Sequence, residues 1–158
     1  MASNRHLGRI VALQALYEHE ARTSAGDEVD LDQVISRNLE RYKDEIDDTD
    51  FVVNLVHGVV KNLKELDETL RPLAPEWPLE QVARVDHTVL RLSLFELLHC
   101  ADQVPPKVAI NEAVELAKAF GSDSSSKFVN GVLGTAYRTL VQGGEANADA
   151  TETETGQV

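Results

Sequence analysis

Residues 84–121 read RVDHTVLRLSLFELLHCADQVPPKVAINEAVELAKAFG, and this stretch decides the fold class. Its apolar residues recur every three to four positions, which is the period of an amphipathic helix, and a pair of prolines interrupts the pattern. The stretch therefore predicts two helices, over about 84–99 and 108–120. Gly121 directly follows the second helix, and we expect it to end that helix in the left-handed conformation.

The helical period continues through the rest of the chain, and no sustained alternation typical of a strand is present. Four more helices are expected, at about residues 4–20, 31–42, 49–70 and 124–142. Polar residues suited to cap the first three are Ser3 or Asn4, Asp30, and Asp48 or Thr49. Because prolines break helices, segment 71–78 is expected to be a connector. The predicted fold class is all-α.

We expect one helical domain over residues 1–142 and a disordered acidic tail over residues 143–158. The tail ends EANADATETETGQV, which is too polar to bury a core of its own. With 158 residues and 17.4 kDa, the chain is long enough for one domain with a substantial core. No apolar run approaches the roughly 20 residues of a membrane span, and no signal peptide is evident. We therefore expect a cytoplasmic protein without membrane contact.

The formal net charge of −12 is concentrated in two segments. Residues 27–50 carry ten acids against three bases (−7), and residues 143–158 carry four acids and no base (−4). The rest of the chain is nearly neutral, and its longest acid-free stretches are 1–17 and 124–144. Since phosphate binding depends mainly on Lys and Arg, these two stretches are the candidates for an anion site.

Constellations typical of enzymes and metal sites are incomplete. Glu96 and His99 form a Glu-x-x-His pair, but a di-metal bundle needs a second such pair, so we interpret them as a surface pair near a helix end. Segment 121–127 lacks the Gly before the Lys and the Ser or Thr after it that a phosphate-binding loop requires. Cys100 has no evident base beside it, which favours a buried structural thiol. We expect no catalytic residue, no metal and no cofactor.

Two features indicate an anion-binding surface. Arg5 and Arg9 are four residues apart, so we expect them on one face of the first helix, near its positive N-terminal end. At the start of the last helix, three serines precede Lys127 and Phe128, and a cation beside an exposed aromatic ring is typical of sequence-tolerant base stacking. The alternatives are a solvated helix start and, for the second feature, helix-capping serines with Phe128 in the core.

Two glycines lie inside the last predicted helix. Gly131 and Gly134 each cost about 1 kcal/mol of helix stability relative to alanine. Such glycines usually permit a close approach to the backbone, either by another helix or by a ligand. Both alternatives stay open.

Four stretches carry a resemblance to a known family. They are residues 12–17 (ALQALY), 85–92 (VDHTVLRL), 104–118 (VPPKVAINEAVELAK) and 127–133 (KFVNGVL). In this order and spacing they resemble the NusB family of bacterial transcription antitermination factors. The resemblance is weakest between residues 22 and 75, and it implies about seven helices in two packed helical bundles.

The resemblance also implies a function. Members of this family bind the boxA element of ribosomal RNA transcripts together with NusE, a small-subunit ribosomal protein, and help RNA polymerase to read through terminators. Carried onto this sequence, the implied RNA contacts are Arg5, His6, Arg9, Lys127 and Phe128. The implied NusE contacts are Tyr17, Asp86, Glu112 and Glu115.

In the mechanism that we expect, the two arginines and Lys127 neutralise RNA phosphates, Phe128 packs on a base, and an acidic flank receives the basic ribosomal partner. Two other hypotheses stay open. In the first, the chain is the RNA-binding part of a ribosomal RNA cytosine methyltransferase, which its length disfavours. In the second, it is a helical protein that homodimerises and buries its RNA face.

Overall fold

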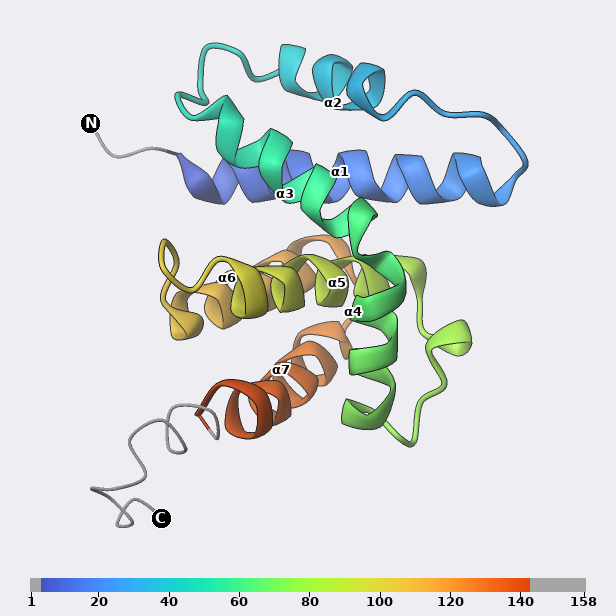
Figure 1. Cartoon of the computed structure of the whole chain (residues 1–158), viewed down its shortest axis with the longest axis vertical. Coiled ribbons are helices and arrows are strands. Elements are labelled where there is room, and N and C mark those ends of the chain that lie inside the picture. Colours follow the sequence, from blue (N-terminus) through green and yellow to red (C-terminus); the bar gives the residue numbers. More distant parts are fainter. Residues whose placement is uncertain (1–3, 143–158) are drawn as a thin grey trace.

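The computed structural model describes residues 4–142, which fold into seven α-helices without a strand (Figure 1). The helices are α1 (Arg5–Ser24), α2 (Leu31–Glu40), α3 (Thr49–Lys61), α4 (Leu63–Leu70), α5 (Arg84–His99), α6 (Pro106–Phe120) and α7 (Ser125–Ala136). Two 3-10 turns follow α4, and a π-helical segment extends α7: η1 (Arg71–Leu73), η2 (Leu79–Gln81) and η3 (Tyr137–Gln142). The expected all-α fold is confirmed. The expected tail, residues 143–158, lies outside the described residues.

Short polar side chains set the beginnings of the first three helices. The Asn4 side chain accepts a hydrogen bond from the backbone N–H of Leu7 at 3.2 Å, and the Asp48 side chain accepts one from Phe51 at 3.1 Å. Asp30 caps α2 in the same way. Each cap satisfies a backbone donor that has no partner inside the helix, which is why these helices begin where they do.

The single helix expected over residues 49–70 is wrong, because the structure has two helices there. The helix is interrupted at Asn62, whose backbone dihedral angles are not α-helical (φ −110°, ψ 20°). Its side-chain Nδ2 donates to the carbonyl oxygen of Gly58 at 2.7 Å. An asparagine side chain that bonds the backbone in this way competes with the regular helical ladder. The break lets α4 turn away from α3 and pack against α5.

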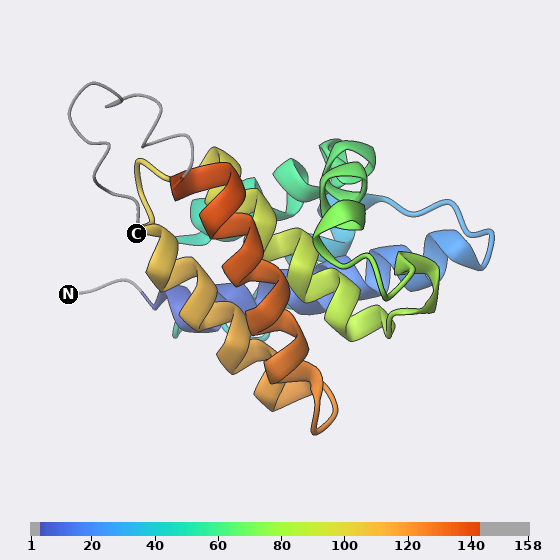
Figure 2. The same cartoon turned by 90° about the horizontal axis from the view of Figure 1, so that it is seen from below.

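Gly121 ends α6, but the expected left-handed conformation is wrong. Its φ of −99° and ψ of −163° are extended backbone. Space is the physical reason for glycine here, because a Cβ would lie 2.8 Å from the carbonyl oxygen of Ala117 and 2.4 Å from Ser125 Oγ. Ser125 Oγ accepts a hydrogen bond from the backbone N–H of Ser122 at 2.9 Å. This tight turn lays α7 alongside α6 (Figure 2).

The helices form two groups that meet along α5. Figure 1 shows α1, α2 and α3 in one half of the molecule and α4 to α7 in the other, and α1 and α3 pack on α5. Leu90 and Leu94 of α5 have no exposed surface, and the core around them is aliphatic. A Cβ at Gly58 would lie 2.1 Å from Phe95 Cζ, so glycine is what allows α3 to lie this close to α5. The two expected bundles are confirmed.

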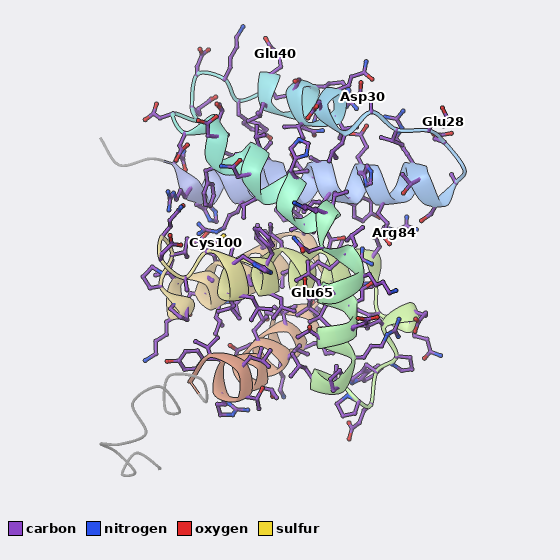
Figure 3. All side chains as sticks on the ribbon, viewed as in Figure 1. Glu28, Asp30, Glu40, Glu65, Arg84 and Cys100 are labelled. Atoms are coloured by element: carbon purple, nitrogen blue, oxygen red, sulfur yellow. The ribbon has the colours of Figure 1, made fainter. Side chains whose placement is uncertain are left out.

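The acidic segment 27–50 surrounds α2. Figure 3 shows Glu28, Asp30 and Glu40 at the α2 end of the molecule, which is the end opposite α7. The start of α7 therefore lies away from this acidic segment, whereas the start of α1 meets its last part at Asp48, which lies 3.7 Å from Arg5. Among residues 4–142, no helix combines the length and apolar character that a bilayer span requires.

Candidate functional site

The expected arginine face of α1 exists, but it turns toward the protein. The guanidinium carbons of Arg5 and Arg9 lie 4.5 Å and 5.1 Å from the centroid of the Phe51 ring, so the two side chains do share a face. Arg5 stays at the surface with 33% of its side chain exposed, and its Nη2 lies 3.7 Å from Asp48 Oδ2. The Arg9 side chain points into the protein, and only 4% of it is exposed.

Arg9 is held by a buried carboxylate of α5. Its Nε donates to Glu96 Oε2 at 2.9 Å and its Nη2 donates to Oε1 at 2.8 Å, while Glu96 itself is 1% exposed. This geometry corrects the expectation that Arg9 presents its charge to RNA phosphates, because the guanidinium is enclosed and already paired. It also corrects the interpretation of Glu96 and His99 as a surface pair. The His99 ring instead stacks on Phe95, with ring centroids 4.9 Å apart.

His6 is the exposed residue at this end of α1. Its side chain is half exposed, and its Nδ1 lies 2.8 Å from Glu112 Oε1. The same Glu112 oxygen is 3.8 Å from Nη1 of Arg9. Glu112, which the resemblance assigns to NusE, therefore lies against the cationic end of α1.

The second candidate element lies at the start of α7. Lys127 is exposed and forms no ion pair within residues 4–142. Phe128 is half-buried and packs against the core. Its ring also meets Trp77 edge-on, with centroids 6.3 Å apart and an interplanar angle of 76°. Trp77 is 57% exposed. Phe128 thus packs on the core with one part of its ring and contacts an exposed tryptophan with another. It is therefore neither a fully exposed stacking residue nor a fully buried core residue.

Trp77, Lys127 and Phe128 form a ridge between two grooves. One groove, of about 360 Å³, opens toward the start of α5, and the other, of about 320 Å³, opens toward η1. We call them the α5 groove and the η1 groove. Beyond the ridge, the α5 groove is lined by residues that include Val82, Asp86 and Ser124. The η1 groove is lined by residues that include Ala74, Glu76 and Gly131.

Asp86 is the acidic residue of the α5 groove. The residue is only 9% exposed, and its buried Oδ1 accepts no hydrogen bond from the described residues. A buried acceptor without a donor is costly, so this oxygen is suited to receive a donor from a bound partner. The carboxylate also lies in the first turn of α5, where the helix dipole favours negative charge.

The other expected NusE contacts lie in two places. Tyr17 is partly exposed, and the guanidinium carbon of Arg84, at the start of α5, lies 5.8 Å from its ring centroid. Figure 3 shows Arg84 beside α1. Glu115 is exposed on α6, and its Oε2 lies 3.6 Å from Lys118 Nζ. The structure therefore brings Tyr17 near the start of α5, whereas the two glutamates of α6 lie elsewhere.

The two candidate RNA elements lie toward opposite ends of α6. Glu112, in the second turn of α6, contacts His6 of α1, whereas the C-terminal end of α6 leads through a short loop into α7. Figures 1 and 2 both show the start of α1 and the start of α7 well separated. From Glu112 to Phe120 the helix rises about 12 Å. A ligand that contacts both elements must therefore span at least this length of α6.

Sequence reasoning missed two aromatic residues of these sites. Trp77 lies in the segment that we interpreted only as a connector, although a lone tryptophan between prolines was a usable signal. Phe51 contacts both arginines, but its position in the apolar pattern of α3 does not distinguish it from a core residue. Both residues owe their roles to contacts between distant parts of the chain.

The titratable groups show little that resembles a reaction centre. Within residues 4–142, no group of three or more His, Cys, Asp and Glu side chains is arranged to hold a metal ion. Burial raises the pKa of the Cys100 thiol to about 11, which keeps it protonated and weakly nucleophilic at neutral pH. The exposed features are instead suited to binding.

The fold and these surfaces define a small all-helical binding protein, with polar and aromatic contact surfaces at the starts of α1, α5 and α7. Residues 6–138 match the NusB family, and the chain belongs to this family. It is 45% identical over 137 residues to transcription antitermination protein NusB of Herpetosiphon aurantiacus, which covers 85% of this chain and 90% of that protein.

Solved structures agree with this assignment. NusB of T. maritima superposes with a TM-score of 0.76 at 31% identity, covering 87% of this chain and 93% of that chain. A structure of antitermination factors NusB and NusE in complex with dsRNA contains a chain that superposes with a TM-score of 0.73 at 23% identity, covering 85% and 96% of the two chains. At this lower identity the second comparison shows a shared fold. The family resemblance of the sequence is confirmed.

Proposed function

We propose that this chain is a transcription antitermination factor that binds boxA-type RNA of ribosomal RNA transcripts together with NusE. The observation that carries the proposal is the family membership, since a relative that is 45% identical over 137 residues is a transcription antitermination protein. Residues 1–142 act as one RNA-binding domain. The complex with RNA and NusE then promotes read-through by RNA polymerase.

The RNA contacts in this proposal come from the starts of two helices. Arg5 and His6 meet the RNA at α1, and Lys127 and Phe128 meet it at α7. Arg9 is left out because its guanidinium is enclosed by Glu96. With so few free cations, counterion release contributes little to affinity, so RNA binding by this chain alone is weak.

NusE strengthens this weak binding through a joint site. Asp86, one of the four expected NusE contacts, lines the same α5 groove as Lys127 and Phe128. A partner that donates a hydrogen bond to the free Oδ1 of Asp86 therefore sits beside the RNA-binding ridge. Tyr17 extends this NusE-binding surface onto α1. The two ligands then share one groove, which is the physical basis for binding them together.

We further propose that the chain acts in the cytoplasm, within the RNA polymerase antitermination complex, and without catalysis, metal or cofactor. A homodimer is the competing occupant of the same faces. Light scattering with and without RNA distinguishes the two, because a dimer that buries the start of α1 has to dissociate when RNA binds.

One titration tests the proposed function. Labelled boxA-type RNA is titrated with the full chain, with and without NusE, at fixed salt and with fluorescence anisotropy as the readout. We expect distinctly tighter binding with NusE. Lys127→Ala should weaken binding in both series, while the control Lys118→Ala, an exposed lysine of α6, should not. Equal affinity with and without NusE contradicts the joint site.

A further inference from the structure

Gly131 has no packing reason to be glycine. It lies on an exposed position inside α7, and a Cβ added there would meet no heavy atom within 4 Å. Alanine at this position would give a more stable helix. Of the two alternatives for a glycine inside this helix, close approach by another helix is therefore excluded at Gly131 within the described residues. A ligand that needs the space remains.

Gly131 opens onto the η1 groove. The groove is bounded by the aromatic pair of Trp77 and Phe128, and Lys127 lies at its edge. Trp77 leaves more than half of its surface in water, although it is held edge-on against a ring that packs on the core. The ring is thus both fixed in place and open on one side. A fixed and open aromatic ring beside a lysine is the arrangement on which unpaired bases stack.

We propose that the η1 groove binds one unpaired base of the RNA, which packs against the Trp77–Phe128 pair and over Gly131 while its phosphate lies at Lys127. The inference rests on the proposed function and adds Trp77 and Gly131 to the site. The uncharged base lies on the Glu76 side of the groove, where the carboxylate repels a phosphate, and the phosphate lies beside Lys127, the cation that lines the same groove.

Tryptophan fluorescence tests the contact directly, since Trp77 is the only tryptophan of the chain. The full chain is titrated with single-stranded boxA-type RNA while fluorescence is recorded, and the anisotropy of the labelled RNA is followed in parallel. We expect the emission of Trp77 to be quenched with the same midpoint as the anisotropy. RNA that binds without changing this emission overturns the inference and leaves the proposed function intact.

Substitutions at Gly131 test whether the open space is used. Gly131→Ala and Gly131→Gln should leave the midpoint of thermal unfolding equal or higher, yet Gly131→Gln should weaken RNA binding by about fivefold or more. Gly134→Ala is the matched control. It lies one turn further along α7 and does not line the η1 groove, and an added Cβ there would meet only Arg138 Nη1, at 3.4 Å.

The outcomes separate the two proposals. If the unsubstituted chain binds no boxA-type RNA even with NusE, the proposed function fails. If it binds RNA and Gly131→Gln binds equally well, only the base pocket fails. If Gly131→Gln instead loses affinity for NusE while its affinity for RNA is unchanged, the groove holds a protein side chain, and the base pocket is overturned.

Discussion

Arg9 illustrates that the local sequence does not distinguish an arginine that binds phosphate from one that forms a buried ion pair. In the amino-acid sequence, an arginine one turn after Arg5 is typical of a phosphate contact. In the fold it is a bidentate partner of Glu96, with both side chains almost fully buried. The difference arises from a glutamate 87 residues away in the chain. No local pattern around Arg9 contains that information.

The buried pair predicts a large effect on stability. Glu96→Ala should lower the free energy of unfolding by about 3–5 kcal/mol, because it removes the bidentate partner of the buried Arg9 charge and leaves only the Glu112 carboxylate, 3.8 Å away. Urea denaturation measures this loss, and Glu115→Ala, an exposed acid of α6, is the control. The double variant Arg9→Met with Glu96→Leu should recover much of the stability. A loss below about 1 kcal/mol for Glu96→Ala would show that water reaches the pair.

Removing the negative charge of Glu112 is predicted to strengthen RNA binding. Its carboxylate lies 2.8 Å from His6 Nδ1, so it competes with an RNA phosphate for that side chain. Glu112→Gln should strengthen RNA binding by up to about fivefold, a change of the size found for one exposed polar pair, because it removes the negative charge beside the RNA site. Glu115→Gln should leave it unchanged. Anisotropy titrations without NusE measure both, and weaker RNA binding by Glu112→Gln would contradict this competition.

At the scale of the helices, much of the fold could be predicted because apolar residues recur with the helical period in α1, α5 and α6, although α5 is buried on nearly every side. The break at Asn62 could not, since it depends on a side chain that donates to the backbone carbonyl oxygen of Gly58 one turn earlier. The sequence correctly predicts that Gly121 ends α6, but the expected left-handed conformation is wrong. A glycine is required there because a Cβ would overlap neighbouring atoms. The groove at Trp77 forms only when η1, η2 and α7 come together. The hydrophobic period predicts single helices, but it carries little information about the places where helices end or pack against one another.

The contact between α3 and α5 predicts that Gly58 tolerates no side chain. Gly58→Ala should lower the free energy of unfolding by about 1–3 kcal/mol, because its Cβ would overlap the Phe95 ring. Thermal or urea unfolding measures the loss, with Gly134→Ala as the control in another helix. Replacing Phe95 by Leu in the Gly58→Ala background should return part of the stability. An unchanged Gly58→Ala variant would mean that α3 can shift along α5 without loss.

Asp67 predicts how the link between α4 and α5 depends on pH. Burial tends to raise the pKa of Asp67, but hydrogen bonds from Arg91 and His87 outweigh it and hold the pKa well below its ordinary value of about 3.9. The unfolded chain therefore binds a proton more readily than the folded one. The stabilisation is fully present above about pH 4 and is lost progressively as the pH falls below that value.

The corresponding variant is Asp67→Asn. It should lower the free energy of unfolding by about 2 kcal/mol at pH 7 and by much less at pH 3. Urea unfolding at both pH values measures the difference. Glu65→Gln, an exposed acid of the same helix, should show neither effect. A loss of equal size at both pH values would mean that Asp67 contributes through shape and not through its charge.

For the whole molecule, total charge is a poor guide to ligand binding. The sum of −12 is dominated by residues 27–50, which surround α2, and by residues 143–158. With Arg9 enclosed, Arg5 and Lys127 are the two permanent cations of the proposed RNA site. The logarithm of RNA affinity should therefore fall with the logarithm of salt concentration with a slope of about −1.4. Anisotropy across a salt series measures the slope, and a value steeper than about −2 would require further cations.

The placement of the two RNA elements along α6 has a consequence for the length of the ligand. Each element offers only a few contacts, and an RNA that reaches both makes the second contact an intramolecular one. Two short RNA fragments that each fit one element have no such advantage, even at the same total base composition. The molecule therefore behaves as a bivalent receptor, and its affinity should rise abruptly once the RNA is long enough to bridge α6.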